Sequence, residues 1–465
     1  MALQAQPLAY VTNQASEDRL WVIDTETNEL VDTVTLEDIP SRVAITPDGS
    51  LAYVTMVVDG DFNQLSGDIL YSSIPSSPVF MGSLSKASAS GSLFTNKVEV
   101  IETATNTIIT TVMTEESAPF DIAMTPDGRF AYVSHLGPAV SVIDTAANEV
   151  IETVPTDGSG LGLAVTPDGA YVYVATSSAD VVSVIETATN TVIVVIEVGE
   201  TPSAIAITPD GAFVYVTNQE SDTISQIEIA SNTVVATQGV GQAPGSIAIT
   251  PDGAFAYVTN QLSNDVSVIA TGTNAVVATI PVGDTPIDTA ITSDGKLVYV
   301  TNIFSESISV IDTASNTVIG TAPAGFLSEG IAITPEVMAT LTIDIKPGNE
   351  QNRLNPASRG GIWIAIQSEG LFDVLQININ TVGFGPLAAS AVGQGVRDVN
   401  KDGLPDLLLR FKVEQTGIGC GDTEATLIGE TLLGQQFAGT DVLETVGCQN
   451  QDRAPPSVLS GDPGR

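Results

Sequence analysis

The chain is poor in basic residues, and this shortage excludes one broad class of partner. Only 15 of its 465 residues are Lys or Arg, against 55 Asp or Glu, so the formal net charge is −40. A field of that sign repels nucleic acid and anionic lipid, and it favours solubility, cations and cationic partners. We therefore expect no nucleic-acid partner. The acidity is typical of a well-solvated exported protein, or of one adapted to salty or calcium-rich surroundings.

Long apolar runs are also missing. The runs that exist have about seven residues, as in "TVIVVIEV" at 191–198, whereas a membrane helix needs roughly 18. The chain begins "MALQAQPLAYV", which has neither the basic nor the apolar region of a signal peptide. We expect strands and no transmembrane segment. The predicted location is extracellular, cell-surface or periplasmic, with an export signal that this chain does not contain.

Histidine and cysteine are almost absent. His135 is the only histidine, and the chain has no Gly-x-Ser-x-Gly elbow, so a Ser–His–Asp site has little support. Phosphate-binding and dinucleotide-binding glycine motifs are missing as well. The two cysteines, Cys420 and Cys448, lack the spacing of zinc ligands. In an exported protein such a pair predicts one disulfide.

What the chain does contain is an internal repeat. The signature Thr-Pro-Asp-Gly recurs, and from Thr125 onward the step is 41 or 42 residues, a period typical of repeat architectures. The signature and its degenerate forms begin at Thr46, Thr125, Thr166, Thr208, Thr250, Thr292 and Thr334.

One unit, 203–244, predicts four short strands separated by Pro-Asp-Gly and Asn turns, which is one blade of a β-propeller. The second-strand tyrosine occurs seven times, so we predict seven blades. The chain starts with "LAYVTN", without a first strand, and the array ends with an isolated first strand at 329–335. The last strand is therefore predicted to complete the first blade and to leave no open edge.

These motifs carry a resemblance to a known family. "YVTN" at Tyr10, Tyr215, Tyr257 and Tyr299, joined to "TPDG" and "VIDTASNTV", resembles the YVTN-type β-propeller repeats of bacterial and archaeal surface and exported proteins. The resemblance covers roughly 8–336. It implies the fold, but it says little about function, because the repeated residues form turns and core.

Function is therefore sought where the repeats differ. An insert at about 57–95 lengthens the second blade, and long loops of this kind are usually functional or disordered. The fourth letter of "YVTN" is His135 in one blade, on the expected ligand face. At the starts of the inner strands the repeat places charged residues, which we expect at one channel mouth, either solvated or forming a small-ligand or cation site. These candidates are Arg42, Asp121, Asp288 and Glu329.

After the repeats, the character of the sequence changes. Residues 1–338 are predicted to be the propeller, 339–448 a small β-sandwich-like domain of a kind that recurs in exported bacterial proteins, and 449–465 a disordered tail. Within the second domain one loop has the oxygen spacing of a calcium loop, although position 12 is Leu409 instead of Glu. We predict Ca²⁺ there. The expected ligands are Asp398, Asn400, Asp402, the Leu404 carbonyl and Asp406.

The sequence leaves three functions open. The leading hypothesis is a non-catalytic exported or cell-surface binding or adhesion protein that presents the propeller to a glycan, an envelope component or a protein. The alternatives are a lactonase- or lyase-like enzyme at the channel mouth, by analogy of fold, and a structural surface-layer component. The lack of nucleophile motifs makes the chain more a binding protein than an enzyme in this interpretation.

Overall fold

The computed structural model describes residues 7–14, 19–58, 94–116, 118–325, 327–335, 339–347, 352–368, 374–431 and 436–447. The chain divides into two compact units, one spanning Gln6–Glu336 and the other formed mainly by Val337–Arg465. Within the described ranges, no helix is both long and apolar enough to span a bilayer. The first unit is the propeller.

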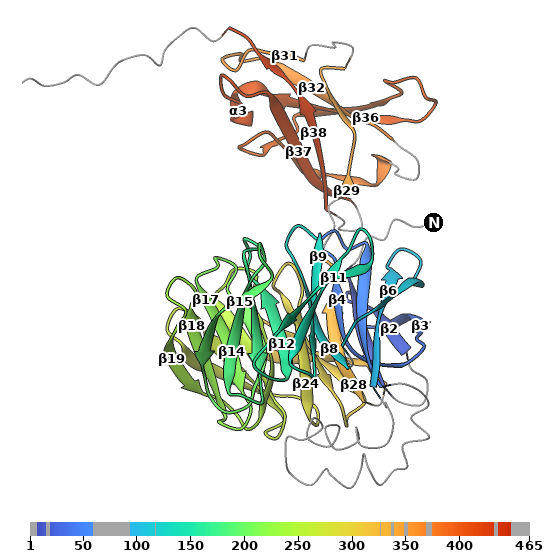
Figure 1. Cartoon of the computed structure of the whole chain (residues 1–465). Helices are drawn as coiled ribbons and strands as arrows, with labels where there is room; N and C mark the ends of the chain where they lie inside the picture. The colour runs from blue at the N-terminus through green and yellow to red at the C-terminus, as the bar shows by residue number, and fades with distance from the viewer. Residues whose placement is uncertain are drawn as a thin grey trace, which may run out of the picture. The chain divides into compact units, whose positions relative to one another are not determined.

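Seven four-stranded antiparallel sheets form the first unit (Figure 1). Each sheet is one blade, and its strands follow one another in chain order except in blade 1. Blade 1 consists of β28 (Ser328–Ile333), β1 (Leu8–Asn13), β2 (Arg19–Asp24) and β3 (Leu30–Thr35). Blade 2 consists of β4 (Ile39–Ile45), β5 (Leu51–Val58), β6 (Phe94–Glu102) and β7 (Thr107–Met113). Blade 3 consists of β8 (Pro119–Met124), β9 (Phe130–His135), β10 (Ala139–Asp144) and β11 (Glu149–Pro155).

The remaining four blades are the most regular part of the ring. Blade 4 consists of β12 (Gly160–Val165), β13 (Tyr171–Thr176), β14 (Val181–Glu186) and β15 (Thr191–Glu197). Blade 5 consists of β16 (Pro202–Ile207), β17 (Phe213–Asn218), β18 (Thr223–Glu228) and β19 (Thr233–Gly239). Blade 6 consists of β20 (Pro244–Ile249), β21 (Phe255–Asn260), β22 (Asp265–Ala270) and β23 (Ala275–Pro281). Blade 7 consists of β24 (Pro286–Ile291), β25 (Leu297–Asn302), β26 (Ser307–Asp312) and β27 (Thr317–Pro323).

The Thr-Pro-Asp-Gly signature forms the turn between the first and second strands of a blade. In blade 5, Thr208 Oγ1 donates to Asp210 Oδ1 over 2.6 Å, and Gly211 N donates to the Thr208 carbonyl over 2.8 Å. Gly211 has φ = +67°, a conformation that glycine adopts without steric cost. The signature is therefore a property of the turn.

The repeated tyrosine of the second strand links each blade to the next one. All seven second-strand tyrosines are fully buried. Tyr173 of blade 4 donates from its hydroxyl to Asn232 Oδ1 of blade 5 over 2.7 Å, and Asn232 is itself in the left-handed turn conformation (φ = +52°). Tyr299 of blade 7 makes the same bond, over 2.8 Å, to Asn28 of blade 1. The repeat thus carries both partners of a bond between neighbouring blades.

The ring closes as the sequence predicts. In Figure 1 the orange β28 pairs with the blue β1, and the register places Tyr10 opposite Ala332 and Val11 opposite Ile331. Apolar clusters then lie between neighbouring blades, as in the one that joins Tyr173 and Val182 of blade 4 to Val214 and Ile227 of blade 5. The prediction of an all-β, seven-bladed propeller is confirmed.

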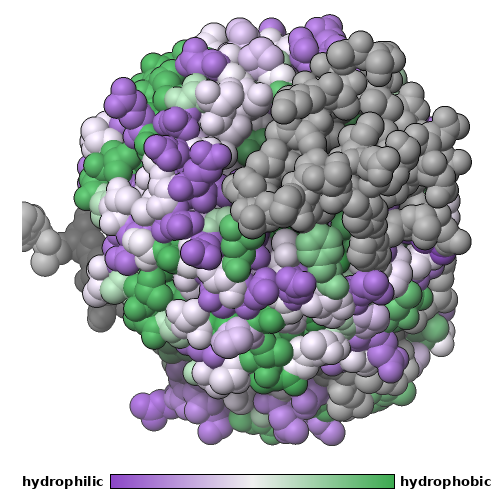
Figure 2. Space-filling view, turned by 90° about the horizontal axis from the view of Figure 1, so that it is seen from below, coloured by the Kyte–Doolittle hydropathy of each residue, from purple (hydrophilic) through white to green (hydrophobic). Residues whose placement is uncertain are grey.

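The outermost strands carry isolated apolar side chains. In the view from below, hydrophobic and hydrophilic residues are interspersed over the visible surface (Figure 2). Scattered single apolar residues are normal on a soluble surface and need no partner to explain them. The outer-strand residues that are about half exposed include Ile109, Ile151, Val195, Val235 and Val277.

The second unit is also a β structure. Its described elements form a five-stranded, a four-stranded and a two-stranded sheet, with one short helix, α3 (Val413–Thr416), and one 3₁₀ turn, η2 (Val374–Gln376). The five-stranded sheet comprises β29 (Ala339–Thr340), β38 (Gln436–Val442), β37 (Glu424–Thr431), β33 (Ile377–Phe384) and β34 (Ala389–Ser390). The four-stranded sheet comprises β30 (Ile343–Ile345), β32 (Gly361–Ile366), β36 (Asp406–Lys412) and β35 (Gly393–Arg397), and the two-stranded sheet β31 (Arg353–Leu354) and β39 (Glu444–Thr445).

Both larger sheets of this unit contribute to one apolar core, with Ile364 and Phe411 from one sheet and Phe384, Leu427 and Phe437 from the other. Three predictions concern residues that the structure does not describe. Residues 59–93 of the insert, residues 449–465 of the tail, and Cys448 all lie outside the described ranges. The disulfide between Cys420 and Cys448 therefore stays a prediction.

Candidate functional site

The first strands of the blades surround the central channel, and their opening residues form one mouth. The backbone there is fixed by the threonine of the neighbouring blade's second strand. Thr55 Oγ1 donates to the Phe120 carbonyl over 2.7 Å, and it also accepts the Arg42 N–H over 3.0 Å. Because these bonds repeat from blade to blade, the position of each mouth residue follows from its place in the repeat.

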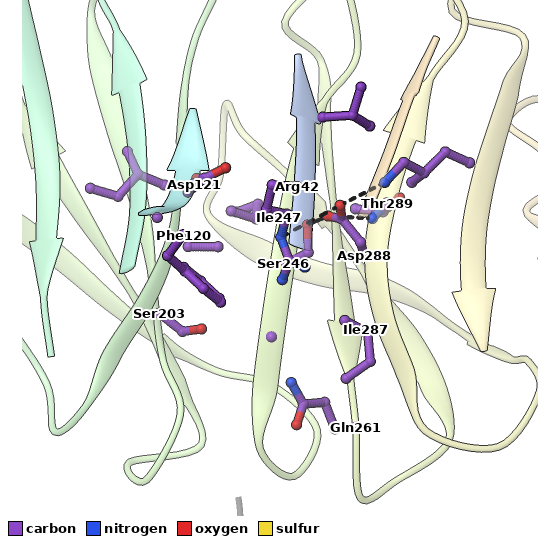
Figure 3. Close-up of a pocket in the computed structure, with 16 residues that line it drawn as sticks. Arg42, Phe120, Asp121, Ser203, Ser246, Ile247, Gln261, Ile287, Asp288 and Thr289 are labelled. Atoms are coloured by element: carbon purple, nitrogen blue, oxygen red, sulfur yellow. Dashed lines mark hydrogen bonds and ion pairs between the residues drawn. The ribbon is translucent and has the colours of Figure 1, made fainter. Parts of the chain in front are cut away.

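Arg42 lies at the centre of this mouth (Figure 3). Its Nε is 3.9 Å from Asp288 Oδ2, and its Nη1 is 3.6 Å from Glu329 Oε2. The guanidinium lies over the ring of Phe120, with 5.2 Å from Cζ to the ring centroid, a distance at which cation–π attraction is effective. The Arg42 Nη1 atom is buried and makes no hydrogen bond within the described part of the chain. Nη1 therefore keeps hydrogen-bonding capacity that no described residue uses, although Glu329 lies at ion-pair distance from it.

Asp121 and Asp288 occupy equivalent positions in blades 3 and 7. Each accepts an N–H from the residue that follows it and another from the first strand of the next blade: Leu163 N donates to Asp121 Oδ2 over 3.1 Å, and Ile331 N to Asp288 Oδ2 over 3.0 Å. Ser246 Oγ also donates to Asp288 Oδ1 over 2.6 Å. Asp288 thus accepts one more hydrogen bond than Asp121.

Burial changes the acid–base properties of the charged groups. Desolvation raises the pKa of Asp121 to about 6, although Arg42 and two backbone N–H groups act in the opposite direction. Desolvation also raises the pKa of Glu329, against the effects of Arg42 and of a hydrogen bond from Ser41. For Arg42, burial disfavours the charged form, but Asp288, Glu329 and Asp121 outweigh it and raise the pKa. A carboxyl group with a pKa near 6 is suited to proton transfer near neutral pH.

Arg42, Asp121 and Asp288 border a cavity of about 200 Å³. Pockets for drug-sized ligands have roughly 300–1,000 Å³, so this one fits a smaller molecule. The remaining lining residues are uncharged. Some are polar, such as Ser203 and Gln261, and others are apolar, such as Ile247 and Ile287 (Figure 3). The repeat prediction therefore brings Arg42, Asp121 and Asp288 together around one cavity, with Glu329 paired to Arg42.

His135 is not part of this cavity, which corrects its prediction as a ligand-binding residue. It is fully buried, and its Nε2 lies 2.9 Å from Ser141 Oγ of the next strand. In blade 5 the equivalent Asn218 bonds Ser225 over 2.9 Å in the same way. The fourth letter of "YVTN" is a structural position, and the histidine performs the role of the asparagine.

Two polar residues of the mouth were missed by the sequence reasoning. Gln261 lines the cavity and accepts a hydrogen bond from Gln219 over 3.1 Å. Both directly follow "YVTN", and Gln14 stands at the same place in blade 1 and donates to the Pro40 carbonyl. A comparison of the residue after each "YVTN" would have found this set.

The predicted calcium loop of the second unit is closed by its own backbone. Asp398 accepts the N–H groups of Lys401 and Gly403, and Gly403 has φ = +93°, as the tight turn requires. Asp406 is fully buried, and its two carboxylate oxygens accept the N–H groups of Val399 in the loop and of Ser368 outside it. The described residues contain no group of three or more His, Cys, Asp or Glu residues placed to hold a metal ion. Calcium binding therefore stays a proposal from the sequence spacing, and calcium titration calorimetry with Asp398→Ala as control tests it.

Another buried acid lies in blade 2. Glu99 of β6 replaces the serine that other blades have at this place, such as Ser183 and Ser225. It is fully buried; its Oε1 accepts the Glu37 N–H over 3.1 Å, and its Oε2 makes no hydrogen bond to any described residue. Asp38 nearby pairs with Lys97 over 2.7 Å. Desolvation raises the pKa of Glu99 to about 7.

Glu99 is therefore expected to make the propeller less stable as the pH rises. Since its pKa is about 7 when folded and about 4.3 in an unfolded chain, the native state holds the proton more tightly. The contribution of Glu99 to stability is complete below about pH 4. It is lost between about pH 4 and pH 7, by about 4 kcal/mol at 1.36 kcal/mol per pKa unit. Glu99→Gln should remove this pH dependence, because an amide does not ionise. Its oxygen can still accept the Glu37 N–H, so the local contact is kept.

Urea unfolding of both proteins at about pH 4 and pH 8 checks this effect. The matched control is Glu102→Gln, on the same strand but only half-buried. If the difference in unfolding free energy between Glu99→Gln and the parent chain is the same at both pH values, the pKa of Glu99 is not raised by folding and the prediction is wrong.

Comparison with known proteins gives a family and a set of similar folds. The family described as "Lactonase, 7-bladed beta-propeller" matches residues 196–275 and 232–319, which is less than half of the chain. None of the curated proteins compared with the chain matches it.

Three solved structures illustrate the likeness. One is a functionally unknown protein from Desulfotomaculum acetoxidans, with 22% identity and a TM-score of 0.57 over 70% of this chain and 99% of that one. Another is a putative 6-phosphogluconolactonase from Bacteroides uniformis, with 16% identity and a TM-score of 0.56 over the same shares. The third is the periplasmic gluconolactonase PpgL of Pseudomonas aeruginosa, with 17% identity, a TM-score of 0.56 and the same shares. At these identities the likeness shows the propeller fold.

These findings overturn the leading sequence hypothesis. The interpretation as a non-catalytic binding or adhesion protein, more a binder than an enzyme, is wrong, because the family model that matches the chain describes lactonases. The family match favours the lactonase alternative. The physical reason for the error is that the sequence argument looked for a nucleophile motif, whereas hydrolysis by an activated water needs only a base and an electrophile.

Proposed function

We propose that the propeller hydrolyses a small lactone in the cavity at the channel mouth. The observation that carries the proposal is the combination, around one cavity, of a carboxyl group with a pKa of about 6 and a buried arginine donor without a hydrogen-bond partner in the described chain. The lactonase family match supports it. A lactone is a cyclic ester, so its hydrolysis requires a base for water and a donor for the developing oxyanion.

Each group has one role in this mechanism. Ionised Asp121 accepts a proton from a water molecule, whose oxygen forms a bond to the lactone carbonyl carbon. Arg42 Nη1 donates to the carbonyl oxygen as it becomes negative, and Asp288 and Glu329 hold the guanidinium in place. The ring carbon–oxygen bond then breaks, and the proton on Asp121 passes to the ring oxygen. Water is consumed and one hydroxy acid is formed, so atoms and charges balance.

An exported or periplasmic location belongs to the same proposal. It is supported by the acidic composition and by the periplasmic gluconolactonase among the similar folds. Separation of periplasmic and cytoplasmic fractions from the source cells tests it.

Gluconolactone hydrolysis tests the proposed activity. Purified chain should release protons from gluconolactone, measured at constant pH, faster than buffer alone. The matched control is the same concentration of the Arg42→Ala, Asp121→Asn double variant, which removes donor and base together. Equal rates for parent, double variant and buffer, with lactones of five- and six-membered rings, would contradict the proposal.

A further inference from the structure

Charged residues occupy only half of the channel mouth. In the blade sequence 7, 1, 2 and 3, the mouth carries Asp288, Glu329, Arg42 and Asp121, which we call the charged arc. Among the described residues that line the cavity, blades 4, 5 and 6 contribute none that is charged. Their part, the neutral arc, comprises Gly162, Ser203, Ala204, Ile205, Gly245, Ser246, Ile247 and Gln261. The two arcs face the same cavity, so a ligand contacts both.

The neutral arc offers hydroxyl and amide groups to a ligand. Ser203 and Gln261 belong to blades 5 and 6 and line the cavity (Figure 3). Its first strands also pack closely: a Cβ at Gly162 would lie 2.6 Å from Ala204 Cα, so only glycine permits this approach. Hydroxyl and amide side chains both donate and accept hydrogen bonds, which suits the hydroxyl groups of an uncharged sugar.

The charged arc disfavours an additional anion. Among the described residues that line the cavity, Arg42 is the only basic one, and it is already paired with Asp288 and Glu329. Asp121 adds a third carboxyl group, so full ionisation would give three negative charges and one positive charge. Asp121 and Asp288 line the cavity itself, so they lie closer to a bound ligand than the Debye length of about 8 Å, and salt screens them only weakly.

We propose that the site accepts an uncharged sugar lactone and excludes a lactone that carries a phosphate. This inference rests on the proposed lactonase function and names its substrate class. A phosphate dianion is recognised by arginine or lysine that is free to bind it, and the lining supplies no second cation. The neutral arc can bind a hydroxyl group where the phosphorylated analogue carries its phosphate. The carboxylates of the charged arc repel that phosphate.

Parallel assays of gluconolactone and 6-phosphogluconolactone test the inference. The expected result is a kcat/KM for gluconolactone that is at least about 10-fold higher, the ratio that corresponds to about 1.4 kcal/mol. Equal rates, or a preference for the phosphorylated lactone, overturn the inference and leave the lactonase function intact. Hydrolysis of neither lactone overturns the lactonase function and the inference with it.

A charge placed in the neutral arc provides the converse test. Ser203→Lys should raise the relative kcat/KM for 6-phosphogluconolactone at least about 10-fold, because the new ammonium can pair with the phosphate. The matched control is Ser231→Lys in the same blade, an exposed turn residue bonded to Glu228 and Thr233. If both variants change selectivity equally, the net charge of the protein and not the cavity determines it, and the inference is overturned.

Discussion

Replacement of Arg42 is expected to lower kcat/KM for gluconolactone by about 100- to 1,000-fold, which is the usual cost of losing one oxyanion donor. The reason is local: Arg42 Nη1 is a buried donor without a hydrogen-bond acceptor in the described chain, and Phe120 and two carboxylates fix its direction. Steady-state kinetics of Arg42→Ala and Arg42→Lys measure the effect. Lysine keeps the charge but loses the planar fork, so it should recover only part of the activity.

Two controls separate catalysis from folding in this experiment. Arg42→Ala leaves Asp288 and Glu329 without their cation, and uncompensated buried charges destabilise a protein by about 3–5 kcal/mol, so the charge-conserving lysine variant is the decisive one. Arg129→Ala is the matched control, because Arg129 also lies over an aromatic ring, 5.3 Å from the centroid of Phe130, but does not line the cavity. A folded Arg42→Lys variant with unchanged kcat/KM would remove Arg42 from the mechanism.

The propeller could be predicted from the sequence because its turns depend on neighbouring residues. The Thr208 and Asp210 side chains and Gly211 form their turn within four residues, so the motif is visible in the text. The period also aligned Arg42, Asp121 and Asp288, which lie far apart in the chain but in equivalent places in their blades. The strand that closes the ring was predicted because blade 1 lacks a first strand.

The same period could not distinguish a functional side chain from a structural one. His135 differs from Asn218 in the alignment, yet both bond a serine on the adjacent strand. Glu99 replaces a serine without any local signal that it would be buried. The proposed activity was not visible either, because the base Asp121 and the donor Arg42 come from different blades and form no contiguous motif. Burial, which gives Asp121 its acid–base properties, exists only once the ring has closed.

Asp121→Asn is expected to lower kcat by about 100- to 10,000-fold, the range that loss of a general base produces. The base must be ionised to accept a proton from water, and the pKa of Asp121 is about 6. For the parent chain, kcat/KM should therefore be constant at higher pH and fall about tenfold per pH unit below about 6. In Asp121→Asn, the remaining kcat/KM should no longer fall below about pH 6. A pH–rate profile of both proteins measures this difference.

Asp288→Asn is the matched comparison, because Asp288 bonds its own next residue and the next blade in the same pattern as Asp121. Both substitutions disturb equivalent backbone contacts, so a purely structural role predicts the same loss of rate and the same pH profile in both variants. If Asp121 is the base, Asp288→Asn is slower than the parent chain but its kcat/KM still falls below about pH 6, since its base is intact. If kcat/KM of Asp121→Asn still falls below about pH 6, another group transfers the proton. Glu329 would then be the next residue to replace, because burial also raises its pKa.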